Sequence, residues 1–478
     1  MAKTKIENIA WLIAWDKELG EHVFMNDVDM VFEGNSIIHI GNGYDGAADT
    51  TISGRGRMVM PGFVDIHSHP TSEPLRRSMT DETLSPGFHH SSLYEYLPVF
   101  ASTPESAAAS MQVAIAELLK SGVTTLVDLS MPFDGWLDIL GESGMRVCAA
   151  PMYRDARWFT RDGHRLEYEW DTGQGRAAMD NAFQLVERAR QHPSGRLSGM
   201  ICPAQIDTCT AELLKESHAF AVERDLPFQI HVSQSVTEFH EMYRRHGRTP
   251  VQWMDDLGVL DDRAILGHAI FLDHHPWLHW TSRDDLPLLA ERGATVAHCP
   301  TVFVRRGISL RSFGSYLKAG VNVGIGTDTY PHNFLTELRV ASYTARTIAE
   351  TVADHRASDI LNAATINGAR ALRRDDIGRL EVGAKADFVI VDLDDPAMRP
   401  VYDPMRTLLY SADDRVIRDV WVDGVEVVKE GRVLTIDLEA ATAALEKAQA
   451  DVLKRIPELD WANRSIEAMA PRSLPIRR

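Results

Sequence analysis

The chain has 478 residues, of which 44% are hydrophobic and 25% are charged, and its formal net charge is −18 at pH 7. This length predicts one large domain with a smaller one. The negative charge argues against nucleic acid or an anionic membrane surface as a partner. Without a secretory leader or an apolar run of about 18 residues, the sequence predicts a cytoplasmic protein with no membrane partner.

Short β-type runs occupy both ends of the chain, separated by Gly and Asn turns. They span residues 6–13, 28–32 and 36–40 near the N-terminus and 387–392, 416–422 and 425–428 near the C-terminus. Neither set is large enough for a core of its own. We therefore expect one small β-sandwich domain formed by residues 1–60 and 376–436. The tail, 437–478, begins with an Ala-, Glu- and Leu-rich stretch that predicts a terminal helix over 437–454.

Between these ends, residues 61–375 alternate short apolar runs with helical patterns, which indicates β/α units and a parallel sheet. Helical spacing is clear at 105–120, 177–191 and 211–224. The apolar runs span residues 63–67, 124–129, 146–153, 197–205, 228–232, 264–272, 294–299 and 321–327. Eight such units predict an α/β fold of the (β/α)8, TIM-like barrel type. A doubly wound open sheet is the alternative, although no glycine-rich nucleotide loop follows the first run.

Ionisable residues recur where these runs end. His67 and His69 close the first run, His231 and His268 lie in the fifth and sixth, and Asp328 follows the eighth. Catalytic groups of such barrels come from the carboxyl ends of the strands. His67 and His69 are two residues apart on one strand, so their imidazoles share a face and converge. This convergence suits a divalent ion such as zinc or iron, with one position kept for water.

Seven motifs of the region are characteristic in combination. They are PGFVDIHSHP at 61–70, SGVTTLVD at 121–128, IHVSQ at 230–234, GHAIFL at 267–272, AHCP at 297–300, GIGTD at 324–328 and IGRLEVGAKAD at 377–387. Together they resemble the amidohydrolase superfamily. The resemblance implies a metal held by His67, His69, His231 and Asp328. It also implies that Asp328 takes a proton from the attacking water and that His268 contacts this water or the substrate.

The fourth run has neither the lysine nor the glutamate with which two-metal members of the superfamily bridge their ions. Lys215 is the nearest lysine and lies in a helical pattern. Cys202 is the alternative bridge, but a single buried cysteine is more often a packing residue. We expect one divalent metal per subunit, zinc in preference to iron. These features resemble the cytosine deaminase and triazine hydrolase branch.

One departure from this branch bears on the substrate. Deaminases of the branch carry a glutamate three residues after the fifth-strand histidine, where this chain has Gln234. A glutamine does not protonate a ring nitrogen, but it hydrogen-bonds an amide or urea oxygen. We expect hydrolysis of a C–N bond in an aryl or heteroaryl amide, urea (a phenylurea, for example) or carbamate. The alternative is a deaminase or dechlorinase of an N-heterocycle, nucleobase or triazine, with Glu238, expected on a solvated helix surface, as the substitute acid.

A second departure follows the seventh run, where the branch continues HCP with Ser-Asn and this chain reads TVFVRRG. Phe303 predicts an apolar wall, and Arg305 or Arg306 predicts a contact to a carbonyl or carboxylate, with a surface role as the alternative. Gln234 and His298 are further substrate-contact candidates. The length of loop 71–90 predicts a lid or a wall of the substrate site. Trp136, Tyr153, Trp158 and Phe159 are candidates for an aromatic lining, with core packing as the alternative for each.

A non-enzymatic scaffold on the same fold is disfavoured, because the set of candidate ligands is complete. Related barrels are commonly dimers or larger. The sequence therefore predicts a homo-oligomeric enzyme that acts on a small molecule.

Overall fold

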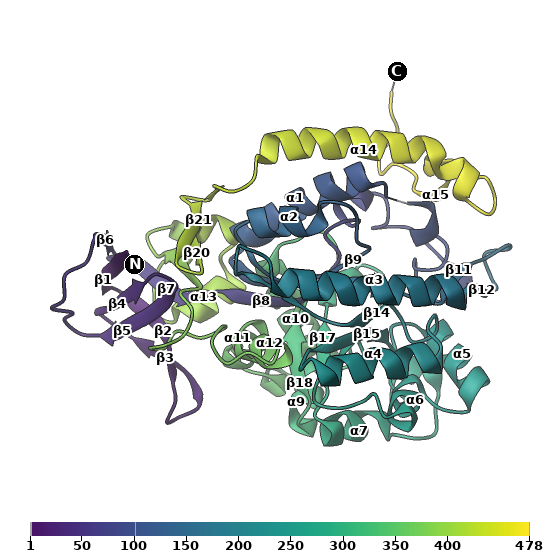
Figure 1. Cartoon of the computed structure of the whole chain (residues 1–478), viewed down its shortest axis with the longest axis horizontal. Coiled ribbons are helices and arrows are strands. Elements are labelled where there is room, and N and C mark those ends of the chain that lie inside the picture. The colour runs from purple at the N-terminus through teal and green to yellow at the C-terminus, as the bar shows by residue number, and fades with distance from the viewer. Residues whose placement is uncertain (1, 101, 478) are drawn as a thin grey trace.

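Strands from the two ends of the chain share one sheet in the computed structural model, which describes residues 2–100 and 102–477 (Figure 1). Its order is β22-β21-β20-β19-β7-β2-β3. The strands are β2 (Trp11–Asp16), β3 (Glu21–Met25), β7 (Arg57–Pro61), β19 (Phe388–Asp392), β20 (Ile417–Val422), β21 (Val425–Lys429) and β22 (Arg432–Val433). The antiparallel pairing of β7 with β19 joins the two ends, with Met60 opposite Val389.

A second sheet, of order β5-β4-β1-β6, packs on the first. It comprises β1 (Lys3–Ile9), β4 (Val28–Glu33), β5 (Ser36–Gly41) and β6 (Thr50–Ser53). One buried cluster contains Phe32 from this sheet and Phe388 from the other, with ring centroids 5.5 Å apart. The expectation of one strand over 6–13 is wrong: the chain turns at Asn8, whose φ is 55°, and continues as β2 in the other sheet.

The central region forms two parallel sheets, of order β13-β10-β9-β8 and β15-β16-β17-β18. Each predicted run contains a strand. The strands are β8 (Phe63–Ser68), β9 (Val123–Ser130), β10 (Arg146–Tyr153), β13 (Leu197–Gly199), β14 (Cys202–Pro203), β15 (Phe228–Val232), β16 (Ala264–His268), β17 (Thr295–His298) and β18 (Asn322–Ile325). In the described ranges, isolated parallel bridges rather than continuous ladders join the sheets, at Ile201–Phe228, Gln205–His231 and Ser68–Asp328.

Two of the predicted runs differ from the observed strands. The fourth run is split into β13 and β14, because the backbone N–H of Ile201 turns to the carbonyl of Pro227 on the neighbouring segment. The sixth run ends early, at His268. His268 and Ala269 have φ values of 83° and 45°, which take the chain out of the strand and place the imidazole at its end.

The predicted helices are present, with starts set by their caps. α1 (Pro104–Lys120) begins after Thr103, which forms a capping box with Ser106. α3 (Thr172–Arg190) begins five residues earlier than predicted, because Asp171 caps the N–H of Gln174 despite two early glycines. α4 (Ala211–Glu223) and the C-terminal α14 (Leu438–Leu459) agree with prediction at their starts. α14 lies along α1 (Figure 1).

The other elements lie in the loops around the parallel strands or near the C-terminal end. They are α2 (Trp136–Glu142), β11 (Ala156–Phe159), β12 (Glu167–Trp170), α5 (Val236–His246), α6 (Pro250–Leu257), α7 (Asp285–Arg292), α8 (Pro300–Val304), α9 (Phe313–Ala319), α10 (Phe334–Ala349), α11 (Ala357–Ala364), α12 (Ile366–Ala371), α13 (Pro404–Tyr410) and α15 (Ile466–Met469). Within residues 2–100 and 102–477, no helix has the length and apolar character needed to cross a membrane.

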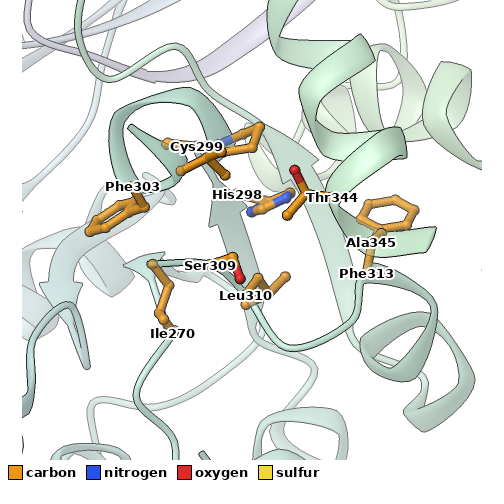
Figure 2. A pocket seen from close by; sticks show the side chains of 11 residues that line it. Ile270, His298, Cys299, Phe303, Ser309, Leu310, Phe313, Thr344 and Ala345 are labelled. Atoms are coloured by element: carbon orange, nitrogen blue, oxygen red, sulfur yellow. The ribbon is translucent and has the colours of Figure 1, made fainter. Parts of the chain in front are cut away.

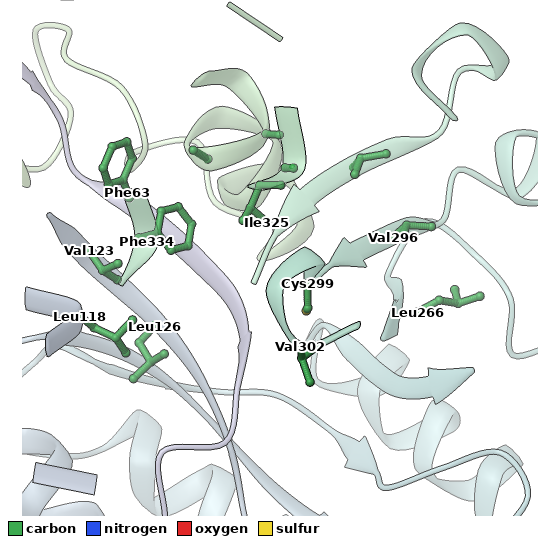
Figure 3. Close-up of a cluster of buried hydrophobic side chains, with 14 of the residues drawn as sticks. Phe63, Leu118, Val123, Leu126, Leu266, Val296, Cys299, Val302, Ile325 and Phe334 are labelled. Atoms are coloured by element: carbon green, nitrogen blue, oxygen red, sulfur yellow. The ribbon is translucent and has the colours of Figure 1, made fainter. Parts of the chain in front are cut away.

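The parallel strands pack outward on their helices through apolar side chains (Figure 3). Phe63 of β8 stacks on Phe334 of α10 with ring centroids 5.3 Å apart, and both side chains are fully buried. Leu118 of α1 and Leu126 of β9 belong to the same cluster. This packing fixes the strand ends, where the polar residues of the predicted site lie.

Asp285, at the start of α7, is a fully buried carboxyl. It accepts hydrogen bonds from the Thr249 hydroxyl (2.6 Å) and the Asp273 backbone N–H (3.0 Å). Burial, followed by the charge of Asp273, raises the pKa of Asp285 from 3.8 to about 7. The folded state therefore holds a proton that the unfolded state has released, and the free energy of unfolding falls as pH rises from about 4 to about 7.

We expect Asp285→Asn to remove this pH dependence, because the amide mimics the protonated carboxyl: Nδ2 donates to the Thr249 hydroxyl and Oδ1 accepts from Asp273. In urea unfolding, the free energy of unfolding of the variant relative to that of the wild type should rise by about 2 kcal/mol between pH 5 and pH 8. The exposed neighbour Asp284, whose side chain makes no capping bond, provides Asp284→Asn as the control. A difference independent of pH would contradict the argument.

Candidate metal centre and active-site cavity

The five ionisable residues expected at the strand ends lie together. The Nε2 atoms of His69 and His231 are 3.2 Å apart. Asp328 Oδ1 lies 3.5 Å from His67 Nε2 and 3.3 Å from His69 Nε2. His268 joins the cluster, with its ring centroid 4.8 Å from that of His67. Strands β8, β15 and β16 and the turn after β18 thus deliver all five side chains to one point.

The outer nitrogen of three of these rings is fixed by an oxygen acceptor. His67 Nδ1 bonds the side-chain oxygen of Gln229 at 2.6 Å. His69 Nδ1 and His231 Nδ1 bond the backbone carbonyls of Leu129 (2.7 Å) and Ala204 (2.6 Å). Because an oxygen acceptor requires Nδ1–H, each neutral ring presents the lone pair of Nε2 to the cluster.

This arrangement fits a metal ion. The Nε2 atoms of His69 and His231 face each other at 3.2 Å, and because neither carries a proton they cannot form a hydrogen bond with each other. His67 Nε2 is buried and also has no hydrogen-bond partner in the described chain. A tetrahedral shell with bonds of about 2.0 to 2.1 Å separates its ligand atoms by about 3.3 Å. The observed separations of 3.2, 3.3 and 3.5 Å match this spacing.

The electrostatics of the cluster favour ligand forms at neutral pH. Burial lowers the pKa of His69 to about 4 and that of His268 to about 3, so both rings are neutral. Burial by itself would raise the pKa of Asp328, but the facing imidazoles, His67 first among them, hold it well below its ordinary value. The cluster therefore offers neutral imidazoles and an ionised carboxylate.

Asp65 fixes the two segments that carry the ligands and was missed in the sequence. Its Oδ1 accepts the backbone N–H groups of His67 (3.1 Å) and Thr327 (3.2 Å), and its Oδ2 accepts the Thr327 hydroxyl (2.6 Å). Asp328, beside Thr327, has a φ of 57°. Asp65 and Gln229 each lie two residues before a ligand histidine, so the period-2 alternation of a strand was the available signal.

The fourth strand region contributes no member to either group of potential ligand atoms among the described residues. Cys202 is fully buried in the apolar cluster between the strands. Burial raises the pKa of its thiol above the ordinary value. A neutral, packed thiol agrees with the expectation that Cys202 is a structural residue.

A cavity of about 720 Å³ opens beside the cluster. His69, His231, His268 and Asp328 form part of its wall. Two of the predicted contact residues, Gln234 and Phe303, also line it. The Nε2 of Gln234 is buried and has no hydrogen-bond partner in the described chain, so its amide faces this space with unused donors.

Arg305 is not among the residues that line the cavity, in contrast to the expectation. Its guanidinium bonds Asp81 Oδ1 (2.7 Å) and the Thr329 hydroxyl (2.8 Å) and lies over the Tyr330 ring. These contacts engage the guanidinium of Arg305 away from the cavity. Arg306, the alternative, lines the cavity instead.

His298 also lies away from this cavity. It lines a separate space of about 10 Å³, large enough for about one water, beside Thr344 and Phe313 (Figure 2). Burial lowers the pKa of His298 to about 3. Phe303 lines both spaces and lies between them.

The loop 71–90 forms part of the cavity wall, and the predicted aromatic lining is present in part. Within the loop 71–90, Glu73, Arg76 and Thr80 line the cavity, as do Trp158 and Phe159 further along the chain. Two of the four expected aromatic residues are placed elsewhere, because their polar atoms bond inside the protein: Trp136 Nε1 donates to Asp128 (2.8 Å) and the Tyr153 hydroxyl donates to Ser217 (2.7 Å).

The expectation that Glu238 lies on a solvated helix surface is wrong. Glu238 is fully buried, and its carboxylate accepts the backbone N–H groups of Ser233 (2.5 Å) and Gln234 (3.2 Å). Burial raises its pKa well above the ordinary value. Glu238 is outside the cavity lining and holds the turn that presents Gln234.

The protein has parallel β/α units, and their strand ends carry a cluster of histidines and an aspartate beside a large cavity. This combination is typical of a hydrolase that uses a divalent metal. The chain belongs to the amidohydrolase family, whose model matches residues 58–427. This membership makes the protein a hydrolase of the kind that acts on carbon–nitrogen bonds.

Similar proteins cover nearly the whole chain. A 5-methylthioadenosine/S-adenosylhomocysteine deaminase of Natronomonas pharaonis is 30% identical over 415 residues, 86% of this chain and 90% of that protein. A 5'-deoxyadenosine deaminase of Methanosphaera stadtmanae is 27% identical over 400 residues, with coverages of 82% and 88%.

Solved structures share the fold. An adenosine deaminase of Xanthomonas campestris with bound zinc has a TM-score of 0.81 at 23% identity, covering 94% of this chain and 98% of its own. Atrazine chlorohydrolase of Arthrobacter aurescens, complexed with zinc, has a TM-score of 0.78 at 22% identity, with coverages of 93% and 100%.

Proposed function

We propose that this protein is a metal-dependent deaminase that releases ammonia from an amino-substituted N-heterocycle. The observation that carries the proposal is the complete cluster of His67, His69, His231, His268 and Asp328 in a chain similar over 86% of its length to a deaminase of adenine-containing compounds. This similarity favours the alternative weighed from the sequence over hydrolysis of an aryl amide, urea or carbamate.

The proposed fold and metal content follow the same family. Three isolated bridges between the two parallel sheets support a (β/α)8 barrel over 61–375. The shared core of the two terminal sheets supports a β-sandwich of 1–60 and 376–436, with 437–478 as a helical tail. One divalent ion per subunit, zinc in preference to iron, is supported by the two groups of potential ligand atoms, which share His67, and by the zinc bound in two similar structures.

A divalent metal bound in this cluster would lower the pKa of a water molecule and so supply a nucleophile at neutral pH. His67, His69 and His231 would hold it through Nε2, and Asp328 through its carboxylate. The ionised Asp328 accepts the proton of the attacking water and returns it to the leaving amine. His268, neutral and at the cavity wall, would hydrogen-bond the attacking water or the substrate beside the reacting carbon.

Gln234 is expected to limit the rate of this reaction. Its amide bonds a ring nitrogen or oxygen but supplies no proton. We expect Gln234→Glu to raise ammonia release at least about tenfold, since a positioned general acid contributes about 10²- to 10⁴-fold. The measurement is kcat against pH, with Gln234→Ala as the variant that removes the contact. Equal rates for Gln234→Glu and Gln234→Ala would contradict a role for a proton at this position.

A substrate screen on protein of measured metal content tests the proposed function. The panel holds adenine nucleosides, cytosine-type pyrimidines, aminotriazines, phenylureas and anilides, with ammonia, aniline and chloride measured separately. We expect ammonia from at least one aminoheterocycle. Aniline release from the phenylureas or anilides with no turnover of the heterocycles would reject the proposal and restore amide or urea hydrolysis.

A further inference from the structure

Arg306 is a cation in the cavity wall without a counter-ion. It follows α8 and lines the same cavity as His268 and Asp328. The one hydrogen bond of its guanidinium within the described chain runs from Nη1 to the Val302 carbonyl, and no carboxylate there lies within ion-pair distance of it. Its Nε is buried and has no partner there. A guanidinium has five N–H donors, so most of those of Arg306 are available to a ligand.

The neighbouring arginines are compensated. Arg76 forms an ion pair with Glu73, and both side chains are buried in the cavity wall. Arg305 forms an ion pair with Asp81 at 2.7 Å. Glu73 and Asp81 are therefore already paired with other guanidiniums. Arg306 is left as the uncompensated charge on this side of the cavity.

An uncompensated, partly buried charge is costly unless a ligand neutralises it. Burial, together with the charge of Arg305, lowers the pKa of Arg306 from its ordinary value. The surroundings of Arg306 therefore disfavour its charged form when no anion is bound. A planar guanidinium with free donors matches a carboxylate, which accepts two parallel hydrogen bonds from it.

We propose that Arg306 binds a carboxylate group of the substrate and thereby selects anionic N-heterocycles. The inference rests on the proposed function, which concerns the amino group that is released. It adds that the heterocycle also carries a carboxylate substituent. Phe303, three residues before Arg306, lines the cavity and contacts His268 with ring centroids 4.6 Å apart. A heteroaromatic ring against Phe303 therefore lies beside the catalytic cluster, in the same cavity that Arg306 lines.

The cavity has a second arginine without a hydrogen bond or ion pair in the described chain, Arg154, which follows β10. It is the natural competitor for an anionic group. Arg154 and Arg306 follow different strands of the parallel sheets. The variants Arg154→Met and Arg306→Met therefore show which of the two arginines binds the anionic group. Arg311→Gln removes the same charge from an exposed position outside the lining and serves as the matched control.

The test uses the metal-loaded full chain and two readouts. The first is kcat/KM for a pair of 4-aminopyrimidines that carry either a carboxylate or a methyl group at the same ring position. We expect the wild-type protein to favour the carboxylate at least about tenfold. Arg306→Met should reduce kcat/KM for the carboxylate about 10- to 100-fold and leave the methyl compound unchanged, and Arg306→Lys should retain part of the preference.

The second readout is equilibrium binding of pyrimidine-5-carboxylate and 5-methylpyrimidine by calorimetry, which requires no turnover. We expect the carboxylate to bind tighter, and this difference to disappear in Arg306→Met alone. If Arg306-dependent binding is present but no heterocycle releases ammonia, the proposed function fails and the carboxylate subsite stands. Equal binding of both compounds, an equal loss for both in Arg306→Met, or a preference that depends on Arg154 would each overturn the inference.

Discussion

Asp328→Asn is expected to reduce kcat about 10³-fold or more while the protein stays folded and retains metal. The substitution keeps a ligand oxygen but removes the charge and the proton acceptor, and a positioned general base contributes about 10²- to 10⁴-fold. The carboxylate is ionised for this task because the facing imidazoles, His67 first among them, hold its pKa low despite burial. Steady-state kinetics and metal analysis on the same sample provide the measurement.

Asp285→Asn is the matched control for this variant. It makes the same chemical change in another buried carboxyl, at the start of α7 and outside the cavity lining. It should leave kcat unchanged. Wild-type turnover in metal-loaded Asp328→Asn would reject the proposed role of the carboxylate, whereas a loss of folding would show as a loss of the cooperative unfolding transition.

His231→Ala is expected to lower metal affinity by at least about 100-fold and to abolish turnover. Loss of a residue that merely orients a ligand costs about 10- to 100-fold in affinity, so loss of a ligand costs at least as much. His231 contributes the nitrogen that faces His69 at 3.2 Å, and its other nitrogen is fixed by the Ala204 carbonyl. Competition with a chelator, followed by elemental analysis, measures the change.

His164→Ala controls for the loss of an imidazole, since His164 is exposed and lies outside the ligand cluster. It should bind metal as the wild type does. Thermal unfolding gives an independent readout: added zinc should raise the melting temperature of the wild type and of His164→Ala more than that of His231→Ala. An equal shift in all three would contradict the assignment of His231 as a ligand.

Specificity and catalysis rest on different residues of one cavity. The cluster at the strand ends performs the chemistry of the proposed reaction, while Gln234, Phe303 and Arg306 provide the walls. Gln234 is positioned by Glu238, whose carboxylate binds the turn before it. Substitutions in the walls should therefore change substrate preference without changing metal content.

The sequence by itself determined the β/α organisation and the five residues of the cluster. Apolar periodicity is a local signal, so each predicted run contains a strand. His67 and His69 are related by the period of a strand, which is local as well. The convergence of His231, His268 and Asp328 on them followed from a general rule, because parallel strands end on one face.

The tertiary structure alone decided which polar residues line the cavity. The adjacent Arg305 and Arg306 are equivalent in sequence, yet Asp81, distant in the chain, binds one and leaves the other facing the cavity. Likewise, Glu238 is buried because backbone N–H groups of the preceding turn bind it, and His298 faces a separate small space. The difference between Arg305 and Arg306 depends on a partner that folding brings from a distant segment, and local periodicity contains no information about it.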